Sequence, residues 1–243
     1  GGFKTGPALG DQGGSSSALR RGMIATSRLA TMTQRLTLTS LPLFPLQAVL
    51  FPGGILALRV FEVRYLDMVR KCQQAGAPFG VVCLHSGDEE RSAGATQEQF
   101  HGVGTLASIE QLSSPQPGLL TLLGRGGQRF RIVRSSLLAH GLWAADVEQL
   151  ADDLPVPIPE DLRKTAAALA QVLATLRQRH PDDAKAITPT SAQLQDCGWV
   201  ANRWCELLPV PLELKQRLMQ LDTPLVRLEL VGDVLERTGI APL

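Results

Sequence analysis

Sulfur and imidazole side chains come closest to a metal-binding pattern at one place in the sequence. Cys83 and His85 are two residues apart, so they would share one face of a strand, and His101 begins a later strand. A metal site needs three or four converging donors. Cys197 and Cys205 lie on one predicted helix, about 12 Å apart in rise, which is too far to share a metal. We therefore predict buried cysteines and neither a metal nor a cofactor.

Nucleophilic and acid–base catalysis lack a suitable arrangement as well. A nucleophilic serine or cysteine needs a neighbouring histidine and an acid that orients it, and no Gly-x-Ser-x-Gly turn occurs. Acidic residues cluster at 88–90, 146/148 and 152–153, but acid–base work needs one member that burial perturbs, and these clusters predict solvated surface. We predict no catalytic residue and no enzymatic activity. A hydrolase with an unrecognised site is the least favoured hypothesis.

Four arginines between residues 125 and 134 are the strongest indication of nucleic-acid binding. Alternation predicts that Arg129, Arg131 and, after a skipped pair, Arg134 share an outward strand face near Arg125. However, the chain has 24 Lys and Arg against 23 Asp and Glu, and aromatic residues for base stacking make up 5%. Nucleic acid is therefore not the expected partner, and an RNA-binding module is the alternative.

The segment 61–65, Phe-Glu-Val-Arg-Tyr, lies where a predicted strand turns into a predicted helix. One interpretation is structural: Phe61 and Tyr65 fasten the helix to the sheet, and the helix dipole favours Glu62 in the first turn. The other is a groove that binds an extended polypeptide. The residues predicted to line this groove are Phe61, Arg64, Tyr65, Arg125 and Arg129.

A polypeptide in this groove could add a strand to an open edge of the predicted sheet. Main-chain hydrogen bonds at such an edge tolerate many sequences. Residues 41–46, Leu-Pro-Leu-Phe-Pro-Leu, would flank the groove. Because Pro42 and Pro45 cannot donate to a ladder, this segment is restricted to an edge or a bulged path.

Residues 36–151 predict a β domain that would position these side chains. Apolar and polar residues alternate with period two or form short apolar runs, separated by glycine and proline turns. Residues 62–74 have helical spacing instead, and Gly76 supplies a stop. We predict a turn at 113–118 and a bulge or hairpin at 124–127. Roughly seven or eight short strands with one inserted helix predict a closed or nearly closed barrel.

The composition changes at residues 152–159, where three prolines predict a stiff extended linker. Residues 160–243 predict a helical bundle. Asp196 is suited to cap one of its helices, and Pro211 and Pro224 are suited to open two others. The expected fold class is therefore α+β, with a β barrel followed by a helical domain.

Residues 1–35 carry no apolar period and predict a disordered segment. The sequence does not begin with Met, whereas Met32 lies inside this segment, so a native tail, a tag and a targeting segment all stay open. The sequence contains no uninterrupted run of roughly 18 apolar residues, so we expect no membrane-spanning helix. Hydrophobic residues make up 44% and charged residues 19%, enough for a sizeable core. Four scattered cysteines suit a reducing compartment, so we expect a cytoplasmic protein.

Several motifs in series resemble the N-terminal domain of Lon proteases. They begin with residues 41–46 and continue with Val-Leu-Phe-Pro-Gly at 49–53 and Leu-Arg-Val-Phe-Glu-Val-Arg-Tyr at 58–65. Downstream, Gly-Val-Gly-Thr-Leu-Ala-Ser-Ile at 102–109 and Gly-Gln-Arg-Phe-Arg-Ile at 127–132 are similar to two strands of that family. The resemblance implies a PUA-like pseudo-barrel followed by helices. It also implies recognition of unfolded or tagged polypeptides.

The same family carries an ATPase and a protease whose motifs this sequence does not show. Phosphate binding needs a loop of the form GxxxxGK[ST], and the glycine cluster at 124–127 has no Lys-Ser/Thr after it. We therefore expect a stand-alone, non-catalytic substrate-binding module. Its expected partners are unfolded or tagged polypeptides and an AAA+ protease or chaperone to which it acts as an adaptor in protein quality control.

Overall fold

The computed structural model describes residues 36–86, 98–181, 183 and 187–240. Residues 1–35, for which we predict disorder, and the acidic cluster at 88–90 lie outside the described residues. Arg35–Leu243 form one unit, so the strands and the helices are described together.

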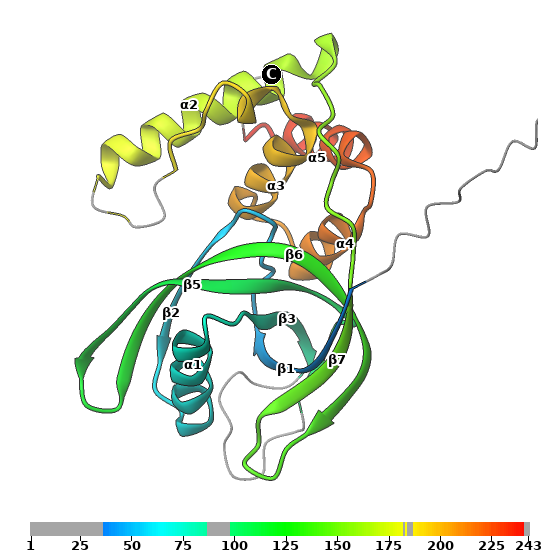
Figure 1. The fold of residues 1–243 in the computed structure, drawn as a ribbon. Coiled ribbons are helices and arrows are strands. Elements are labelled where there is room, and N and C mark those ends of the chain that lie inside the picture. Colours follow the sequence, from blue (N-terminus) through cyan, green and yellow to red (C-terminus); the bar gives the residue numbers. More distant parts are fainter. Residues whose placement is uncertain (1–35, 87–97, 182, 184–186, 241–243) are drawn as a thin grey trace, which may run out of the picture. The chain divides into compact units, whose positions relative to one another are not determined.

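Five strands close into a ring. They are β1 (Thr37–Leu46), β3 (Phe79–Ser86), β5 (Val103–Gln116), β6 (Leu119–Leu137) and β7 (Trp143–Gln149). β1 pairs in parallel with β3 and antiparallel with β7, while β5 pairs with both β3 and β6, and β6 returns to β7. The predicted barrel is therefore present, and Figure 1 shows the long β5 and β6 arching over it.

Two strands lie outside this ring. β2 (Ile55–Val60) pairs antiparallel with residues 120–125 of β6, and the short β4 (Gln99–Phe100) pairs with β3. β6 is long enough to pair with both β2 and β7. Its residues 120–125 pair with β2, and its residues 130–137 pair with β7. β5 occupies the opposite edge of β6, so β2 extends the sheet beyond the ring.

The inserted helix α1 (Val63–Ala75) agrees with the helical spacing of the sequence to within one residue. Glu62 is its N-cap, and Gly76 ends it with a φ of +58°, a left-handed conformation that glycine adopts without a Cβ penalty. Tyr65 stacks on Phe44 of β1 with ring centroids 4.0 Å apart. The helix therefore closes the apolar core on the inner side of the barrel.

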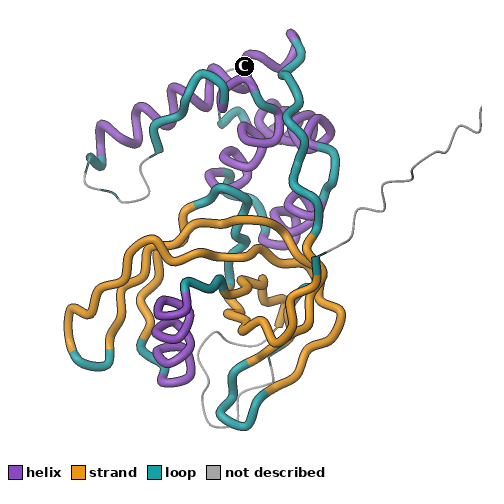
Figure 2. Tube along the Cα trace, viewed as in Figure 1, coloured by secondary structure: helices purple, strands orange, loops and turns teal. Residues whose placement is uncertain are grey.

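The helices that follow the barrel build a second apolar core. The chain enters through a short turn, η1 (Glu160–Leu162), and a second such turn, η2 (Gln193–Gln195), precedes α3. The four helices are α2 (Arg163–Arg179), α3 (Cys197–Leu207), α4 (Leu212–Gln220) and α5 (Pro224–Thr238). Trp204 of α3 is buried at the centre and donates to the carbonyl of Thr165 at 2.9 Å. Figure 2 shows these helices on one side of the strands. The α+β class predicted from the sequence is thus observed.

The proline-rich linker is held against the helices. The Val156 amide donates to Asp196 Oδ1 at 2.9 Å, and the Cys197 amide donates to the Val156 carbonyl at 2.8 Å. The second oxygen of Asp196 accepts from the Trp199 amide, which confirms the predicted helix cap. One aspartate therefore caps α3 and anchors the linker.

Two local expectations need correction. Residues 113–116 continue β5, and the turn is confined to Pro117 and Gly118, where φ is +77°. The glycines at 124–127 do not end β6. Of the two expectations there, the bulge is observed as a shift of register between β5 and β6, and the hairpin is not.

No helix within the described ranges is long and apolar enough to cross a membrane.

Candidate functional site

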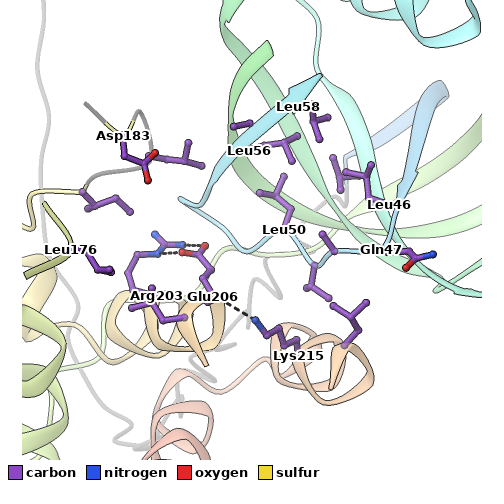
Figure 3. A pocket seen from close by; sticks show the side chains of 18 of the residues that line it. Leu46, Gln47, Leu50, Leu56, Leu58, Leu176, Asp183, Arg203, Glu206 and Lys215 are labelled. Carbon is purple, nitrogen blue, oxygen red and sulfur yellow. Dashed lines mark hydrogen bonds and ion pairs between the residues drawn. The ribbon is translucent and has the colours of Figure 1, made fainter. Parts of the chain in front are cut away.

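A cleft of about 590 Å³ lies between the barrel and the helices. On the barrel side, the end of β1, the loop after it and the first part of β2 line it; on the other side, α2, α3 and α4 do so. Figure 3 shows leucines from both sides pointing toward this space. The leucines are Leu46, Leu50, Leu56, Leu58, Leu173, Leu176, Leu207 and Leu212.

The helix side of the cleft carries apolar surface that the fold leaves accessible. Leu176 near the end of α2 is 39% exposed, and Leu207 at the end of α3 is 38% exposed. The sequence places Leu176 on the same apolar stripe as Leu169 and Leu173, both of which are buried. Leu176 thus continues a core-facing stripe beyond the point where the core covers it. The cleft can therefore take up apolar side chains from another molecule.

An ion pair of a buried arginine and a partly buried glutamate lines the cleft on α3. Arg203 donates from Nε to Glu206 Oε2 at 2.8 Å and from Nη2 to Glu206 Oε1 at 2.6 Å, a bidentate pair within one turn of α3. Arg203 Nη2 also donates to the Pro52 carbonyl at 3.0 Å. Because Arg203 is almost fully buried, this contact fixes the barrel loop to α3.

The sequence Pro52-Gly53-Gly54 fits this contact. Gly53 has a φ of +75°, a left-handed conformation that favours glycine because glycine has no Cβ. A Cβ on Gly54 would lie 2.3 Å from Glu206 Oε1 and 2.9 Å from the Phe51 carbonyl oxygen. The two glycines are therefore needed to bring the loop against the ion pair.

Lys215 of α4 adds a polar group to the cleft wall. Its Nζ donates to the carbonyl of Glu206 at 3.1 Å, as Figure 3 shows. Burial lowers the pKa of Lys215 below its ordinary value. Its ammonium group is thus partly desolvated beside apolar walls, where a hydrogen-bond acceptor on a bound molecule would interact with it more strongly than in water.

A polar clamp joins the barrel to the helices away from the cleft. Asp153 of the linker accepts from Arg227 Nη1 at 2.5 Å and from Arg129 Nη2 at 3.3 Å. Arg129 Nη1 also donates to the Met219 and Leu221 carbonyls at 3.0 and 3.1 Å. Both guanidinium groups are almost fully buried. One carboxylate thus links β6, the linker and α5.

Two of the residues predicted to bind polypeptide belong to the protein interior. Arg64 donates to Glu98 Oε1 at 2.9 Å, to Glu62 Oε2 at 2.9 Å and to the Gly141 carbonyl at 2.8 Å. Tyr65 is buried under Arg64 and stacked on Phe44 as described above. The contacts of Tyr65 match the structural interpretation of the segment, in which it fastens α1 to the barrel, whereas Phe61, the other residue of that interpretation, is half exposed.

Arg129 corrects the expectation of a shared arginine face. Alternation predicts an outward direction for Arg129, but carbonyls from the end of α4 cover this part of β6, so the side chain is buried. Arg134 is exposed and pairs with Asp146 at 2.6 Å, and Arg125 pairs with Glu110. Arg129 is thus in the interior, Arg125 and Arg134 belong to separate surface ion pairs, and Arg131 is exposed.

Phe61 and Arg125 are the two predicted binding residues whose side chains reach solvent. Phe61 is 52% exposed directly after the last residue of β2. Arg125 pairs in register with Ile55, the first residue of β2, and donates to the Gly53 carbonyl at 3.3 Å. The structure does not bring them together: Phe61 follows the end of β2, and Arg125 lies on β6 beside the start of β2.

The residues considered for metal or thiol chemistry are separated. The rings of His85 and His101 lie 5.3 Å apart, and His101 Nε2 is 3.3 Å from Glu213 Oε2. Within the part of the chain that the structure describes, no three His, Cys, Asp or Glu side chains could hold a metal. All four cysteines are buried, and burial raises the pKa of Cys197 to about 11 and that of Cys205 to about 12. Both thiols therefore stay protonated near neutral pH.

The sequence of this chain matches a known protein family. A family model described as the ATP-dependent protease La (LON) substrate-binding domain matches residues 40–237. The chain belongs to this family. The match covers the barrel, the linker and nearly all of the helical part, including every described residue of the cleft.

Solved structures of this LON substrate-binding family have the same fold. The crystal structure of a Lon N-terminal domain protein from Xanthomonas campestris is 33% identical, with a TM-score of 0.57, and the match covers 81% of this chain and 98% of that one. The N-terminal domain of the Mycobacterium avium complex Lon protease is 13% identical with a TM-score of 0.51, covering 80% and 96%, and shows the fold alone.

Two curated relatives are longer than the chain. The Lon protease of Anaeromyxobacter dehalogenans and Lon protease 2 of Myxococcus xanthus are each 25% identical over 203 residues, which is 81% of this chain. The matched part is 23% of either relative, so the chain spans about a quarter of their length. The similarity to the LON family thus concerns its substrate-binding domain and not its ATPase or protease domains.

Sequence reasoning missed the residues that shape the cleft. Leu176 and Leu207 look like ordinary core positions of amphipathic helices, and Arg203 with Glu206 looks like a surface ion pair. One signal was available: two consecutive glycines after Pro52 predict a close approach of backbone to another group, but not to which group.

Proposed function

We propose that this protein is a non-catalytic module that holds an extended, apolar segment of a client polypeptide in the cleft between the barrel and the helices. The observation that carries the proposal is the accessible leucine surface on the helix wall of a cleft whose barrel wall is also lined by leucines, in a chain of the LON substrate-binding domain family. An unfolded polypeptide exposes apolar side chains that a folded protein buries, so such a surface selects for unfolded clients.

The energetics of the cleft suit transient binding. Each leucine, valine or phenylalanine side chain that moves from water into an apolar site contributes about 1.5–3 kcal/mol. Ordering a flexible segment offsets much of this gain. Two or three client side chains between walls such as Leu56 and Leu176 therefore support reversible binding, which suits a module that passes clients onward.

We also propose a class of partner protein and a cellular compartment. The chain corresponds to about a quarter of the curated Lon proteases, so we propose that an AAA+ protease or chaperone supplies the work of unfolding while this module acts as its adaptor. Four buried thiols are consistent with a reducing compartment, and we place the protein in the cytoplasm. We assign it no catalytic activity.

Binding of an unfolded client to matched leucine variants tests the proposal. The client is a reduced and carboxymethylated protein carrying a fluorophore, and its affinity is measured by fluorescence anisotropy. Leu176→Arg puts a charge into the cleft and should weaken binding about tenfold or more, because a desolvated arginine opposes apolar contact. The control is Leu230→Arg on α5, since Leu230 is 41% exposed, like Leu176 at 39%, but does not line the cleft.

The two variants also separate the possible outcomes. Equal weakening by both substitutions, or no binding by the unmodified protein, would contradict the proposal. Release of peptide fragments or turnover of ATP by the purified protein alone would contradict the absence of catalysis.

A further inference from the structure

One edge of β2 faces the cleft without a partner strand. β2 pairs with β6 along one edge, and no other strand within the described ranges pairs with it. In an antiparallel pair, every second residue directs its N–H and C=O groups toward the partner strand. The alternate residues direct theirs to the opposite edge, where they can pair with another chain.

The residues that line the cleft show that the edge of β2, and not one of its faces, borders this space. Ile55, Leu56, Ala57 and Leu58 are consecutive, and all four line the cleft. Successive side chains of a strand point to opposite faces of the sheet. A cavity over one face would therefore be lined by every second residue. A lining of four consecutive residues places the cavity along the strand edge.

The cleft offers such an edge both backbone and side-chain partners for an extended chain. Leu176 and Leu207 stand across from β2 on the helix side, and Leu46 and Leu50 lie on the barrel side. A strand that paired with β2 would direct its alternate side chains to opposite faces, so apolar residues at every second position would meet the leucines on one side. A helical segment would leave the backbone groups of β2 without partners.

We propose that the client binds by strand addition: an extended segment with apolar residues at alternate positions pairs with the free edge of β2. This inference rests on the proposed function and specifies the binding mode at the same site. It also gives Phe61 a role, since Phe61 directly follows the last residue of β2. The added strand would run along the free edge of β2, with the main-chain hydrogen bonds providing tolerance of sequence.

Backbone methylation of a probe peptide tests the binding mode without altering the protein. The probe is a fluorescent peptide that alternates valine with threonine, flanked by lysines for solubility. Two further versions carry N-methyl groups on every second residue and differ in phase: one is methylated at the odd-numbered positions and the other at the even-numbered positions. Methylation removes the N–H donors from one edge of an added strand and leaves the side chains unchanged. Strand addition predicts a loss of affinity of about tenfold or more in one phase and less than about threefold in the other.

Amide exchange in the protein supplies a second readout. On binding of the unmethylated peptide, alternate amides of Ile55–Val60 should gain protection from hydrogen exchange as measured by NMR, while the amides already paired with β6 stay protected throughout. A second copy of this chain is the other possible occupant of the edge. In that case the alternate amides would be protected at high protein concentration without peptide, which would overturn the proposal.

The failure of this inference can be told from the failure of the proposed function. If the peptide binds, is sensitive to Leu176→Arg, and responds equally to methylation in both phases, the cleft holds clients by side chains alone and strand addition is wrong. If the peptide does not bind at all while an unfolded protein client does, strand addition is again overturned. If neither binds, the proposed function itself fails.

Discussion

The two sides of the junction between barrel and helices are built in opposite ways. On one side, Arg129, Asp153 and Arg227 form a buried clamp in which the arginines also donate to backbone carbonyls. On the other side lies the cleft, where leucines face an open space of about 590 Å³. The clamp satisfies polar groups that would otherwise be costly to bury, whereas the cleft leaves apolar surface uncovered.

This difference indicates how the protein keeps the cleft open. Apolar surfaces on a flexible junction would collapse onto each other to exclude water. The clamp and the contact of Arg203 with the Pro52 carbonyl hold the walls at two separate places. The cleft therefore persists because polar contacts with defined directions set the spacing of its walls.

Removal of the clamp should have the largest effect. Arg227→Met retains the apolar stem but loses the ion pair with Asp153 and the hydrogen bonds to Leu218, Leu221 and Asn202. Breaking a buried charged network costs about 3–5 kcal/mol, so we expect a loss of that size in the free energy of unfolding. Urea unfolding monitored by tryptophan fluorescence measures it.

The matched control for the clamp is a surface ion pair. Arg217 is 75% exposed and pairs with Glu213 at 3.4 Å, so Arg217→Met should change stability by less than about 1 kcal/mol. Similar unfolding midpoints for the two variants would show that the clamp does not hold the junction.

Disturbing the close contact between the loop at residues 52–54 and α3 should have the next largest effect on stability. Gly54→Ala brings a Cβ within 2.9 Å of the Phe51 carbonyl oxygen and 2.3 Å of Glu206 Oε1, so the loop must shift away from the ion pair. We expect a loss of stability of about 1–3 kcal/mol and weaker client binding.

Gly102→Ala is the control for the loop variant, because a Cβ there meets no atom within 4 Å. It should leave the stability nearly unchanged. Equal stability of Gly54→Ala and Gly102→Ala would mean that the barrel loop is not held against α3.

The sequence predicted the elements of this fold better than the site between them. Local signals were sufficient for α1, because its apolar spacing and Gly76 both lie within the helix and its cap. The same is true of the Asp196 cap. The register shift near 124–127 was expected from its glycines. Each of these features depends on residues that are neighbours in the chain.

The site depends on contacts between distant residues, which a single sequence does not reveal. Alternation along β6 places Arg129 outward, and it is the arrival of α4, some ninety positions later, that buries it. Leu176 continues a core-facing stripe, and the stripe alone does not show that this leucine lines a cleft and stays accessible.

The thiol of Cys205 can report on whether α3 stays packed when the clamp is broken. Burial raises its pKa from an ordinary value of 9.0 to about 12, so its thiolate fraction at neutral pH is lower by about a thousandfold. We expect iodoacetamide to modify Cys205 slowly in the native protein and measurably faster in Arg227→Met. Mass spectrometry of the labelled peptides measures both rates. Rapid labelling of the unaltered protein would contradict the buried position of Cys205.

The end of β2 should show the smallest effect. Phe61→Ser removes an exposed aromatic ring next to the last residue of the strand, and we expect client affinity to fall about two- to threefold, as for a contact at the rim of a binding site. Val133→Ser is the control, since Val133 is 64% exposed and does not line the cleft. A loss larger than that of Leu176→Arg would move the centre of binding from the cleft to Phe61.

Photo-crosslinking from inside the cleft tests most directly whether clients bind there. A benzophenone amino acid is introduced in place of Leu176 in one protein and in place of Leu230 in another, and each is irradiated with an unfolded client. We expect abundant crosslinks from position 176 that excess unlabelled client suppresses, and few from position 230. Equal yields from the two positions would contradict it.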